Sequence, residues 1–375
     1  MRDAIVVSGW TWEATNVPER LAISLAQAGA RVLYCENPIS LARRRREPEL
    51  TEVIRNVHRF QPRCISHRLS SMPVLSQAQG LLLARQIAKK AKVLKLVSPV
   101  LFYPHGVEAL LLAEQMKRWM GFNLVHFLMD YELPDSLKHA EISDVSLVIP
   151  RAAFTELHAR FDGKVHPMRQ ISMPAELRSA KPSGKAAEFA AELPRPRLLY
   201  LGDLIGRTDE PLVLELLRRH PEWHFISFGA TQLDVPNHHV LPWLVPGELS
   251  ALLNRDAIGF LPYRLTDPKN LHCVPLKLFD FFEARVPVVA TPIAYLKECA
   301  DLVYAGANCG ELETAIQRAQ TEAADSPLKE RRLAFSRAHT TENCARWLSP
   351  LLTNANEFPP PDWDKNEVVN LLETS

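Results

Sequence analysis

The chain has 375 residues, of which 47% are hydrophobic and 23% charged, so its composition is that of a globular protein long enough for two domains. Lys and Arg outnumber Asp and Glu by 24 to 17 in residues 1–180, whereas the remaining residues hold 20 against 26. No acidic residue lies between Glu52 and Glu108, which indicates that the first half faces something anionic. No helix-turn-helix, zinc or RNP-like signal accompanies the basic residues, so we expect no nucleic-acid partner.

The six cysteines form no Cys-x-x-Cys pair and have no metal-ligand spacing, which is typical of reduced thiols in a cytoplasmic protein. The chain enters a strand almost at once, so we expect no signal peptide. No apolar run approaches the ~20 residues needed to span a bilayer. These features predict a cytoplasmic protein, and the basic residues between 53 and 107 add a hypothesis of peripheral contact with the anionic inner leaflet of a membrane.

The first half begins with a β-α-β unit, since a strand is expected over 4–7, a helix over 18–28 and a second strand over 31–35. The loop after the first strand carries Trp10 instead of a Gly-x-Gly-x-x-Gly run, so a nicotinamide or flavin cofactor is not expected. A helix around 76–95 has a basic outer face, which either lies on an anionic membrane or is simply solvated. Further strands are expected at 99–103, 123–127 and 145–149.

The second half is a separate α/β unit, preceded by a proline-containing linker. Its strands are expected at 198–201, 223–228, 240–241, 257–263, 286–290 and 302–304. A helix over 341–352 is long enough to cross back to the first domain. We therefore expect domains at 1–173 and 197–340, a linker at 174–196, a crossing-back helix at 341–358 and a mobile tail at 359–375.

The most informative stretch runs from Cys273 to Pro292 and predicts a short helix followed by a buried strand. Pro275 suits the first helical position, and Lys277 follows in the first turn, where the helix dipole disfavours a cation by roughly 0.3–1 kcal/mol. An anion bound at the helix N-terminus would explain that placement. Asp280 lies one turn later on the same face, so the two side chains could hold a nucleotide diphosphate and its ribose hydroxyls. Spacing alone equally allows a solvated Lys–Asp pair.

Six motifs follow one another in the second half: Leu199-Tyr-Leu-Gly-Asp203, Pro221-Glu-Trp-His-Phe-Ile-Ser-Phe-Gly229, Asn237-His-His-Val-Leu241, Ile258-Gly-Phe-Leu-Pro-Tyr-Arg264, Pro275-Leu-Lys-Leu-Phe-Asp280 and Pro287-Val-Val-Ala-Thr291. This set resembles the donor domain of GT-B glycosyltransferases, especially the GT4/GT70-like bacterial enzymes of cell-surface polysaccharide biosynthesis. The early pattern of Trp10 and Val17-Pro-Glu-Arg20-Leu-Ala is similar to theirs. The resemblance implies an α/β GT-B fold, in which two Rossmann-like parallel-sheet domains face a cleft and a C-terminal helix crosses back to the first domain.

The resemblance also implies a donor site. Gly202 would let the main chain approach the donor diphosphate, Lys277 would neutralise the leaving nucleotide, and Asp280 would bind the ribose where the family usually has Glu. His272 stands where retaining members carry the first Glu of a Glu-x7-Glu pair, so stereochemistry stays open and we favour inversion. Arg285 replaces the glycine that usually follows the motif helix. The donor-binding candidates are Gly202, Tyr263, Arg264, His272, Lys277 and Asp280.

An inverting transfer needs a general base to take the proton of the acceptor hydroxyl. Asp130 ends a strand of the first domain where the resembled family has an Asp, although the same residue type also serves as a helix N-cap or loop carboxylate. No metal site is legible, and Lys277 could supply the charge that a metal supplies in other transferases, so neither a metal nor a cofactor is expected. The acceptor-side candidates are Trp10, Arg20, His105, His126 and Glu132.

The function implied by the resemblance is that of a hexosyl-type glycosyltransferase of the EC 2.4 class. It would move a sugar from a nucleotide-diphosphate sugar, UDP-linked, to a glycan or lipid-linked acceptor in surface polysaccharide synthesis. One alternative is a nucleotide-sugar epimerase of the same fold, which would turn over donor without acceptor. Another is a non-catalytic sugar-nucleotide-binding subunit of a polysaccharide assembly complex, which would bind UDP without transfer.

Overall fold

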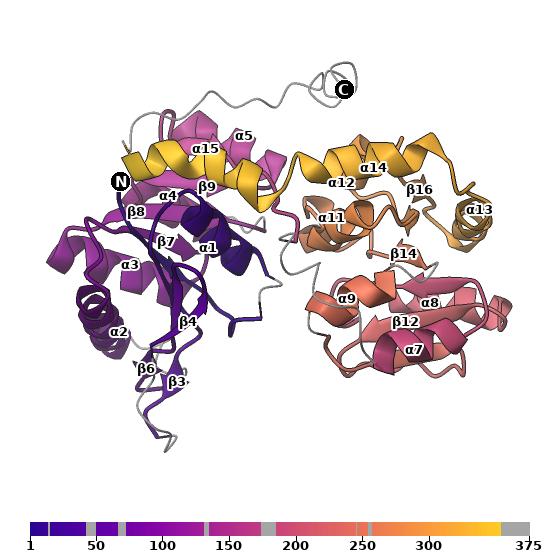
Figure 1. The fold of residues 1–375 in the computed structure, drawn as a ribbon, viewed down its shortest axis with the longest axis horizontal. Helices are drawn as coiled ribbons and strands as arrows, with labels where there is room; N and C mark the ends of the chain where they lie inside the picture. The colour runs from indigo at the N-terminus through magenta and orange to yellow at the C-terminus, as the bar shows by residue number, and fades with distance from the viewer. Residues whose placement is uncertain are drawn as a thin grey trace. The chain divides into compact units, whose positions relative to one another are not determined.

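The computed structural model describes residues 1–13, 16–42, 50–66, 73–130, 135–173, 185–244, 246–253 and 257–353. The chain divides into two compact units: Met1–Ile171 together with the segment that starts at Thr341, and Ser172–Thr340 (Figure 1). Each unit contains its own largely parallel sheet, as the sequence predicts. Glu132, the expected tail and residues 174–184 of the expected linker lie outside the described residues.

The first unit is built on an eight-stranded sheet with the order β10-β9-β8-β7-β1-β2-β5-β4. Adjacent strands are parallel except β4 and β5, which form an antiparallel hairpin that the sequence analysis does not predict. The central strands are short apolar runs, because a parallel sheet buries both of its faces. The strands are β1 (Ala4–Val7), β2 (Val32–Cys35), β4 (Thr51–Ile54), β5 (Val57–Phe60), β7 (Val100–Pro104), β8 (Asn123–Leu128), β9 (Val145–Val148) and β10 (Val165–Pro167), and a separate parallel pair is β3 (Ile39–Ser40) and β6 (Arg63–Cys64).

Helices cover this sheet, and the last helix of the described chain belongs to the same unit. The helix α15 packs along α1, so the predicted return of the chain to its first domain is confirmed (Figure 1). No helix among the described residues is both long enough and apolar enough to span a bilayer. The helices are α1 (Val17–Gln27), α2 (Pro73–Val93), α3 (Val107–Met120), α4 (Asp135–Ile142), α5 (Arg151–Arg160) and α15 (Thr341–Thr353).

The second unit has a six-stranded, fully parallel sheet with the order β13-β12-β11-β14-β15-β16. A helix, α7, forms inside the segment expected to be a linker and packs against α9. The strands are β11 (Arg197–Leu199), β12 (His224–Phe228), β13 (His238–Leu241), β14 (Ile258–Leu261), β15 (Val288–Ala290) and β16 (Tyr304–Ala305). The helices are α7 (Lys185–Glu192), α8 (Glu210–Arg219), α9 (Pro246–Leu253), α10 (Pro268–Leu271), α11 (Leu276–Glu283), α12 (Ala294–Glu298), α13 (Cys309–Gln320) and α14 (Pro327–Arg337).

The helix α11 is held on the sheet by its aromatic side chains. Phe279, Phe281 and Phe282 are completely buried. The ring of Phe281 lies over Gly259 of β14, so close that a Cβ at residue 259 would lie 2.8 Å from the ring carbons. Glycine therefore allows α11 to approach the strand, and this contact fixes the position of the helix that carries Lys277.

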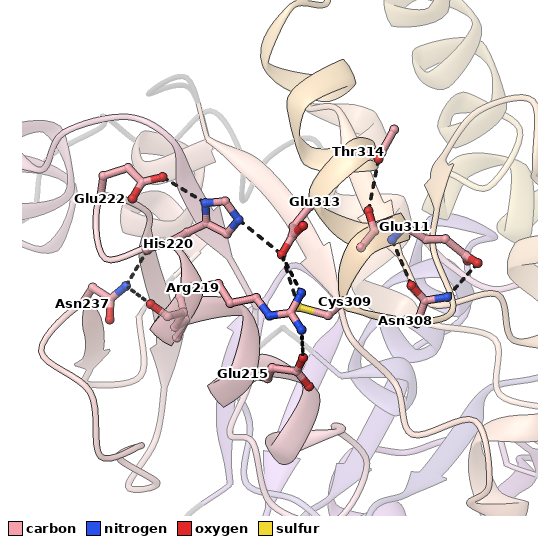
Figure 2. A network of polar contacts seen from close by, with 12 residues as sticks. Glu215, Arg219, His220, Glu222, Asn237, Asn308, Cys309, Glu311, Glu313 and Thr314 are labelled. Atoms are coloured by element: carbon pink, nitrogen blue, oxygen red, sulfur yellow. Dashed lines mark hydrogen bonds and ion pairs between the residues drawn. The ribbon is translucent and has the colours of Figure 1, made fainter.

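A polar network ties α8 to α13 in the same unit (Figure 2). The Glu313 carboxylate lies 3.4 Å from Nη1 of Arg219 and 3.3 Å from Nε2 of His220. The ring of His220 stacks on Trp223 with 3.8 Å between ring centroids. Because its charged side chains are largely satisfied by one another, we assign this network a role in holding the helices together.

Replacing Gly259 with alanine should destabilise the protein by about 1–3 kcal/mol, because the added methyl group must displace the Phe281 ring or the α11 backbone. The free energy of urea-induced unfolding measures the effect. Gly310→Ala in α13 is the matched control, since a Cβ there meets nothing closer than 3.7 Å. Equal stability of the two variants would contradict the proposed close approach of α11 to β14.

Candidate functional site

The structure brings Lys277 and Gly202 together at the carboxyl edge of the second sheet. Gly202 follows β11, and Lys277 is in the first turn of α11. A Cβ at residue 202 would lie 2.9 Å from Cε and 3.4 Å from Nζ of Lys277. The same ammonium group lies 4.8 Å from the centroid of the Tyr200 ring, within the range of a cation–π contact. Carboxyl ends of parallel strands are where α/β proteins bind ligands.

Lys277 has no hydrogen bond or ion pair with any residue that the structure describes. Its ammonium group makes a cation–π contact with the Tyr200 ring. The sequence left open a solvated pair of Lys277 with Asp280, and the structure contains no such ion pair. Asp280 is instead largely buried in α11, with 7% of its surface exposed. Pro275 is the N-cap of α11, one residue before the first helical position that the sequence analysis predicts for it. The helix begins at Leu276 without a side-chain cap, so its N-terminus and the Lys277 ammonium together create a site of positive potential.

Two loops at this edge are joined to each other. The first, residues 200–209, follows β11, and the second, residues 262–273, follows the neighbouring strand β14. Arg264 N–H donates to the carbonyl of Arg207 at 3.0 Å, and Thr208 forms an isolated bridge with the buried Tyr263. Nη1 of Arg207 lies 3.2 Å from Sγ of Cys273, just before α11. Arg207 is thus a second cation at the site, and its position depends on tertiary contacts that no motif reveals.

The turn beside Gly202 is shaped by Asp203. Gly229 has a φ of 111°, and a Cβ there would lie 2.5 Å from Oδ2 of Asp203. The same carboxylate oxygen accepts a hydrogen bond from Ala230 N–H at 3.1 Å. Although burial acts to raise it, the pKa of Asp203 lies below its ordinary value, because Thr231 and nearby main-chain N–H groups donate to the carboxylate. Asp203 therefore stays ionised and fixes the loop that contains Gly202.

The first unit contains a cluster of three histidines: His126 in β8, His105 directly after β7 and His139 in α4. His126 is fully buried in β8, and its ring lies 4.7 Å from that of His139 and 5.5 Å from that of Tyr103, measured between centroids. The His105 ring lies 5.0 Å from that of His139. Burial, together with the neighbouring His139 and His105, holds the pKa of His126 well below its ordinary value. His126 is therefore neutral at physiological pH.

The other acceptor-side candidates occupy different environments in this unit. Asp130 is partly buried and follows β8, next to the strand β7 that precedes His105, so both residues lie at the carboxyl edge of the sheet. Trp10 is 45% exposed in the loop after β1. Arg20 is 1% exposed, and its Nη1 donates to the carbonyl of Ile171 at 2.9 Å, so its guanidinium supports the fold of the unit. A role of Arg20 toward an acceptor stays a prediction.

In the part of the chain that the structure describes, no three His, Cys, Asp or Glu side chains are arranged to hold a metal ion. His272 ends α10 and is partly exposed, four residues before α11 begins. The donor-side candidates all lie in the second unit, and the acceptor-side candidates that the structure describes all lie in the first. Their roles in binding or catalysis stay predictions.

Comparison with known proteins gives one match by sequence. No model of a protein family matches the chain. Over 102 residues it is 31% identical to a Bacillus subtilis (strain 168) protein named as a teichuronic acid biosynthesis glycosyltransferase, TuaH, a match that covers 24% of this chain. The matched residues span only 25% of the length of that relative.

Solved structures match over nearly the whole chain. Sucrose-phosphate synthase from Thermosynechococcus elongatus superposes with a TM-score of 0.68 at 13% identity and covers 94% of this chain and 99% of its own. An E. coli structure described as trehalose-6-phosphate bound with UDP-2-fluoro glucose gives a TM-score of 0.66 at 13% identity. That match covers 96% of this chain and 100% of the E. coli chain. The fold is GT-B. A Listeria monocytogenes structure described as a UDP-N-acetylglucosamine 2-epimerase superposes with a TM-score of 0.56 at 10% identity. That match covers 96% of this chain and 99% of the Listeria chain.

The GT-B fold confirms the resemblance that the sequence motifs predict, and with it the α/β class. The motifs between residues 199 and 291 lie where β11, β12, β13, β14, α11 and β15 are found. Arg285, for which the resemblance implies a glycine, has a φ of 57°, in the left-handed region that glycine adopts more readily. The turn after α11 therefore has a backbone conformation that suits the expected glycine.

Below pH 6.5 the buried His126 should make the protein acid-sensitive. Its pKa is lowered by folding, so the unfolded chain takes up a proton that the folded chain does not, and stability falls as the pH drops. If His126 stays neutral when folded, the loss between pH 7.5 and 5.5 is about 1.4 kcal/mol. The free energy of unfolding at both pH values, compared with that of His126→Met, measures this difference. An equal loss of unfolding free energy in the wild type and in His126→Met would refute the role of His126 in acid sensitivity.

Proposed function

We propose that the protein is a cytoplasmic glycosyltransferase that takes a sugar from a nucleotide-diphosphate sugar, UDP-linked, and transfers it to a glycan or lipid-linked acceptor of surface polysaccharide synthesis. The observation that carries the proposal is the Lys277 ammonium group, which lies against Gly202 at the N-terminus of α11 without an acidic partner among the described residues. The GT-B fold and the relative named in teichuronic acid biosynthesis support this choice.

In this proposal the donor diphosphate binds between the Gly202 loop and the start of α11. Main-chain approach is possible at residue 202 because no side chain occupies the space beside Lys277. Lys277, Arg207 and the α11 N–H groups stabilise the negative charge that develops on the leaving nucleotide. We propose Asp280 for the ribose hydroxyls, and Tyr263, Arg264 and His272 for the remaining donor contacts. These cations would supply the positive charge, so we propose transfer without a metal or cofactor.

On the acceptor side we propose Asp130 as the general base. A carboxylate at a strand end can accept the proton of a sugar hydroxyl as that hydroxyl attacks the anomeric carbon. His105 lies at the same edge of the sheet, and Trp10 offers an exposed aromatic surface on which a sugar can stack. His126 is neutral and buried, so we propose that it supports His139 and Tyr103. Glu132 stays a reserve candidate for the base.

An epimerase of the same fold is the second candidate, and the structural likeness to the Listeria protein favours its inclusion. It would convert the donor sugar in the absence of acceptor. A non-catalytic subunit that binds a sugar nucleotide is the third, and it would bind UDP but turn over nothing.

We further propose that an anionic membrane surface contacts the first unit near the ends of α2 and α3. Both helices end just before the neighbouring parallel strands β7 and β8, so their C-termini lie at the same edge of the sheet. Val93, Val97 and Trp119 are 61%, 58% and 62% exposed there. The exposed basic residues of this region are Arg85, Lys89, Lys92, Lys95, Lys117, which pairs with Asp144, and Arg118. Apolar and aromatic groups surrounded by Lys and Arg are typical of interfacial binding.

The nucleotide site is tested by thermal shift and calorimetric titration with UDP, GDP, ADP and TDP. UDP at 100 times its Kd should stabilise the wild type by about 2.7 kcal/mol. Lys277→Ala should weaken UDP binding ~10–100-fold, since a charge-assisted hydrogen bond contributes about 1.5–3 kcal/mol. Gly202→Ala should also weaken it, because the new methyl group displaces the end of the Lys277 side chain.

Lys297→Ala, which removes an exposed cation of the same unit, is the matched control and should bind UDP as the wild type does. Asp130→Asn should keep UDP affinity and lose transfer, measured as UDP release that depends on acceptor. Wild-type protein that binds none of the four nucleotides would refute the proposed function. If the protein converted the UDP-sugar without any acceptor, the proposed transferase function would be replaced by that of a nucleotide-sugar epimerase.

Membrane contact is tested by sedimentation with phosphatidylglycerol vesicles at low salt. Each Lys near an anionic surface contributes ~1 kcal/mol, so the triple variant Lys89→Glu, Lys92→Glu, Lys95→Glu should bind at least ~100-fold more weakly. The control reverses the same number of charges in the second unit, as Lys297→Glu, Lys329→Glu, Arg337→Glu, and should sediment like the wild type. The proposed membrane contact would be rejected if both variants lost vesicle binding equally, or if the wild type did not sediment with the vesicles.

A further inference from the structure

Asn270 is a completely buried polar residue that joins the two loops at the carboxyl edge of the second sheet. It lies in the short helix α10, with 0% of its surface exposed. Its Nδ2 donates to the carbonyl of Arg207 at 2.7 Å and to the carbonyl of Arg264 at 3.0 Å. The two N–H bonds of one amide group therefore hold together a residue of the β11 loop and a residue of the β14 loop.

The same two loops are linked by their main chains. Asp209 N–H donates to the carbonyl of Pro262 at 2.8 Å, and Arg264 N–H donates to the carbonyl of Arg207 at 3.0 Å. Oγ1 of Thr291, which directly follows β15, donates to the carbonyl of Tyr263 at 2.7 Å. The carbonyl of Arg207 accepts two hydrogen bonds, one from Arg264 N–H and one from Nδ2 of Asn270.

Asn270 is also connected to the start of α11. Its carbonyl accepts a hydrogen bond from Cys273 N–H at 3.2 Å, and Sγ of Cys273 lies 3.2 Å from Nη1 of Arg207. The chain then passes through Pro275 into the turn that carries Lys277. One buried amide thus determines the main-chain positions of Arg207 and Arg264 and contacts the segment that leads to Lys277.

We propose that Asn270 is a positioning residue of the donor site, which sets the separation of Arg207, Arg264 and Lys277 around the donor diphosphate. This inference rests on the proposed nucleotide-sugar function. Without the amide, the carbonyl of Arg264 loses the Asn270 donor and the carbonyl of Arg207 keeps only the N–H of Arg264, so water must enter between the loops to replace the lost bonds. The arginines then lose their fixed spacing, and a diphosphate must order both loops when it binds.

The chain offers a matched control in Asn237, which Figure 2 shows beside His220. Asn237 is also buried, and its Nδ2 donates to the carbonyls of Leu217, His220 and Trp223 at 3.1, 3.0 and 2.8 Å. It has the same side chain and the same kind of partners, but it joins the end of α8 to β13 and contacts neither of the two loops.

The experiment measures the Kd for UDP by calorimetric titration, at a temperature where all proteins are folded. Asn270→Ala should weaken UDP binding at least tenfold, and Asn237→Ala should bind UDP within twofold of the wild type although both lower the Tm. Asn270→Ser, which keeps one short donor, should fall between the wild type and Asn270→Ala, and it replaces the alanine variant if that does not fold.

Hydrogen exchange separates this proposal from the proposed function. In Asn270→Ala, main-chain amides of residues 204–209 and 262–273 should exchange at least tenfold faster, and in Asn237→Ala they should not. Unchanged exchange there, unchanged UDP affinity, or equal loss of affinity in Asn237→Ala would overturn the proposal. If the wild type binds no nucleotide, the donor role falls with the proposed function, and exchange alone decides whether Asn270 joins the loops.

Discussion

The arrangement of the second unit depends on a cation that is held at the positive end of a helix. Lys277 is unfavourably placed by the α11 dipole, and no described carboxylate compensates it. The fold nevertheless keeps its side chain against Gly202 and the Tyr200 ring, because Phe281 packs on Gly259 and fixes the helix. The unit thus maintains local electrostatic strain at the edge where parallel sheets commonly bind ligands, and this strain supports the proposed anion site.

The sequence predicts the order of the elements well, because apolar runs and Pro or Gly residues mark their ends. The helix α11 and strand β15 are found close to where Pro275 and Val286–Ala290 place them. The β4–β5 hairpin is missed, because its residues alternate weakly and its pairing with β2 is a long-range contact. The helix α7 is missed because the neighbouring prolines dominate the segment, whereas its stability comes from packing on α9.

The candidate site is predicted unevenly for a related physical reason. Lys277 stands out because a cation is unusual at a helix start, and Asp280 because it follows Lys277 by one turn. Gly202 is predicted through the resemblance of its motif. Arg207 and Asn270 do not stand out, since an exposed-type residue in a loop has no sequence signal until its partners are known. Burial of His126 is equally hidden, because a central parallel strand buries both faces and gives no alternation to interpret.

Arg285 ends α11 in a backbone conformation that is costly for any residue except glycine. A non-glycine residue in the left-handed region costs about 1–2 kcal/mol, and here the arginine adopts a φ of 57° to end α11. Its Nε lies 2.9 Å from Oε1 of Glu330, but this exposed pair offsets less than about 1 kcal/mol. The fold therefore accepts a net backbone cost at Arg285. The turn has a structural role, because Val286 N–H donates to the carbonyl of Phe281 there and the chain passes directly from α11 into β15, which keeps the helix that carries Lys277 beside the sheet.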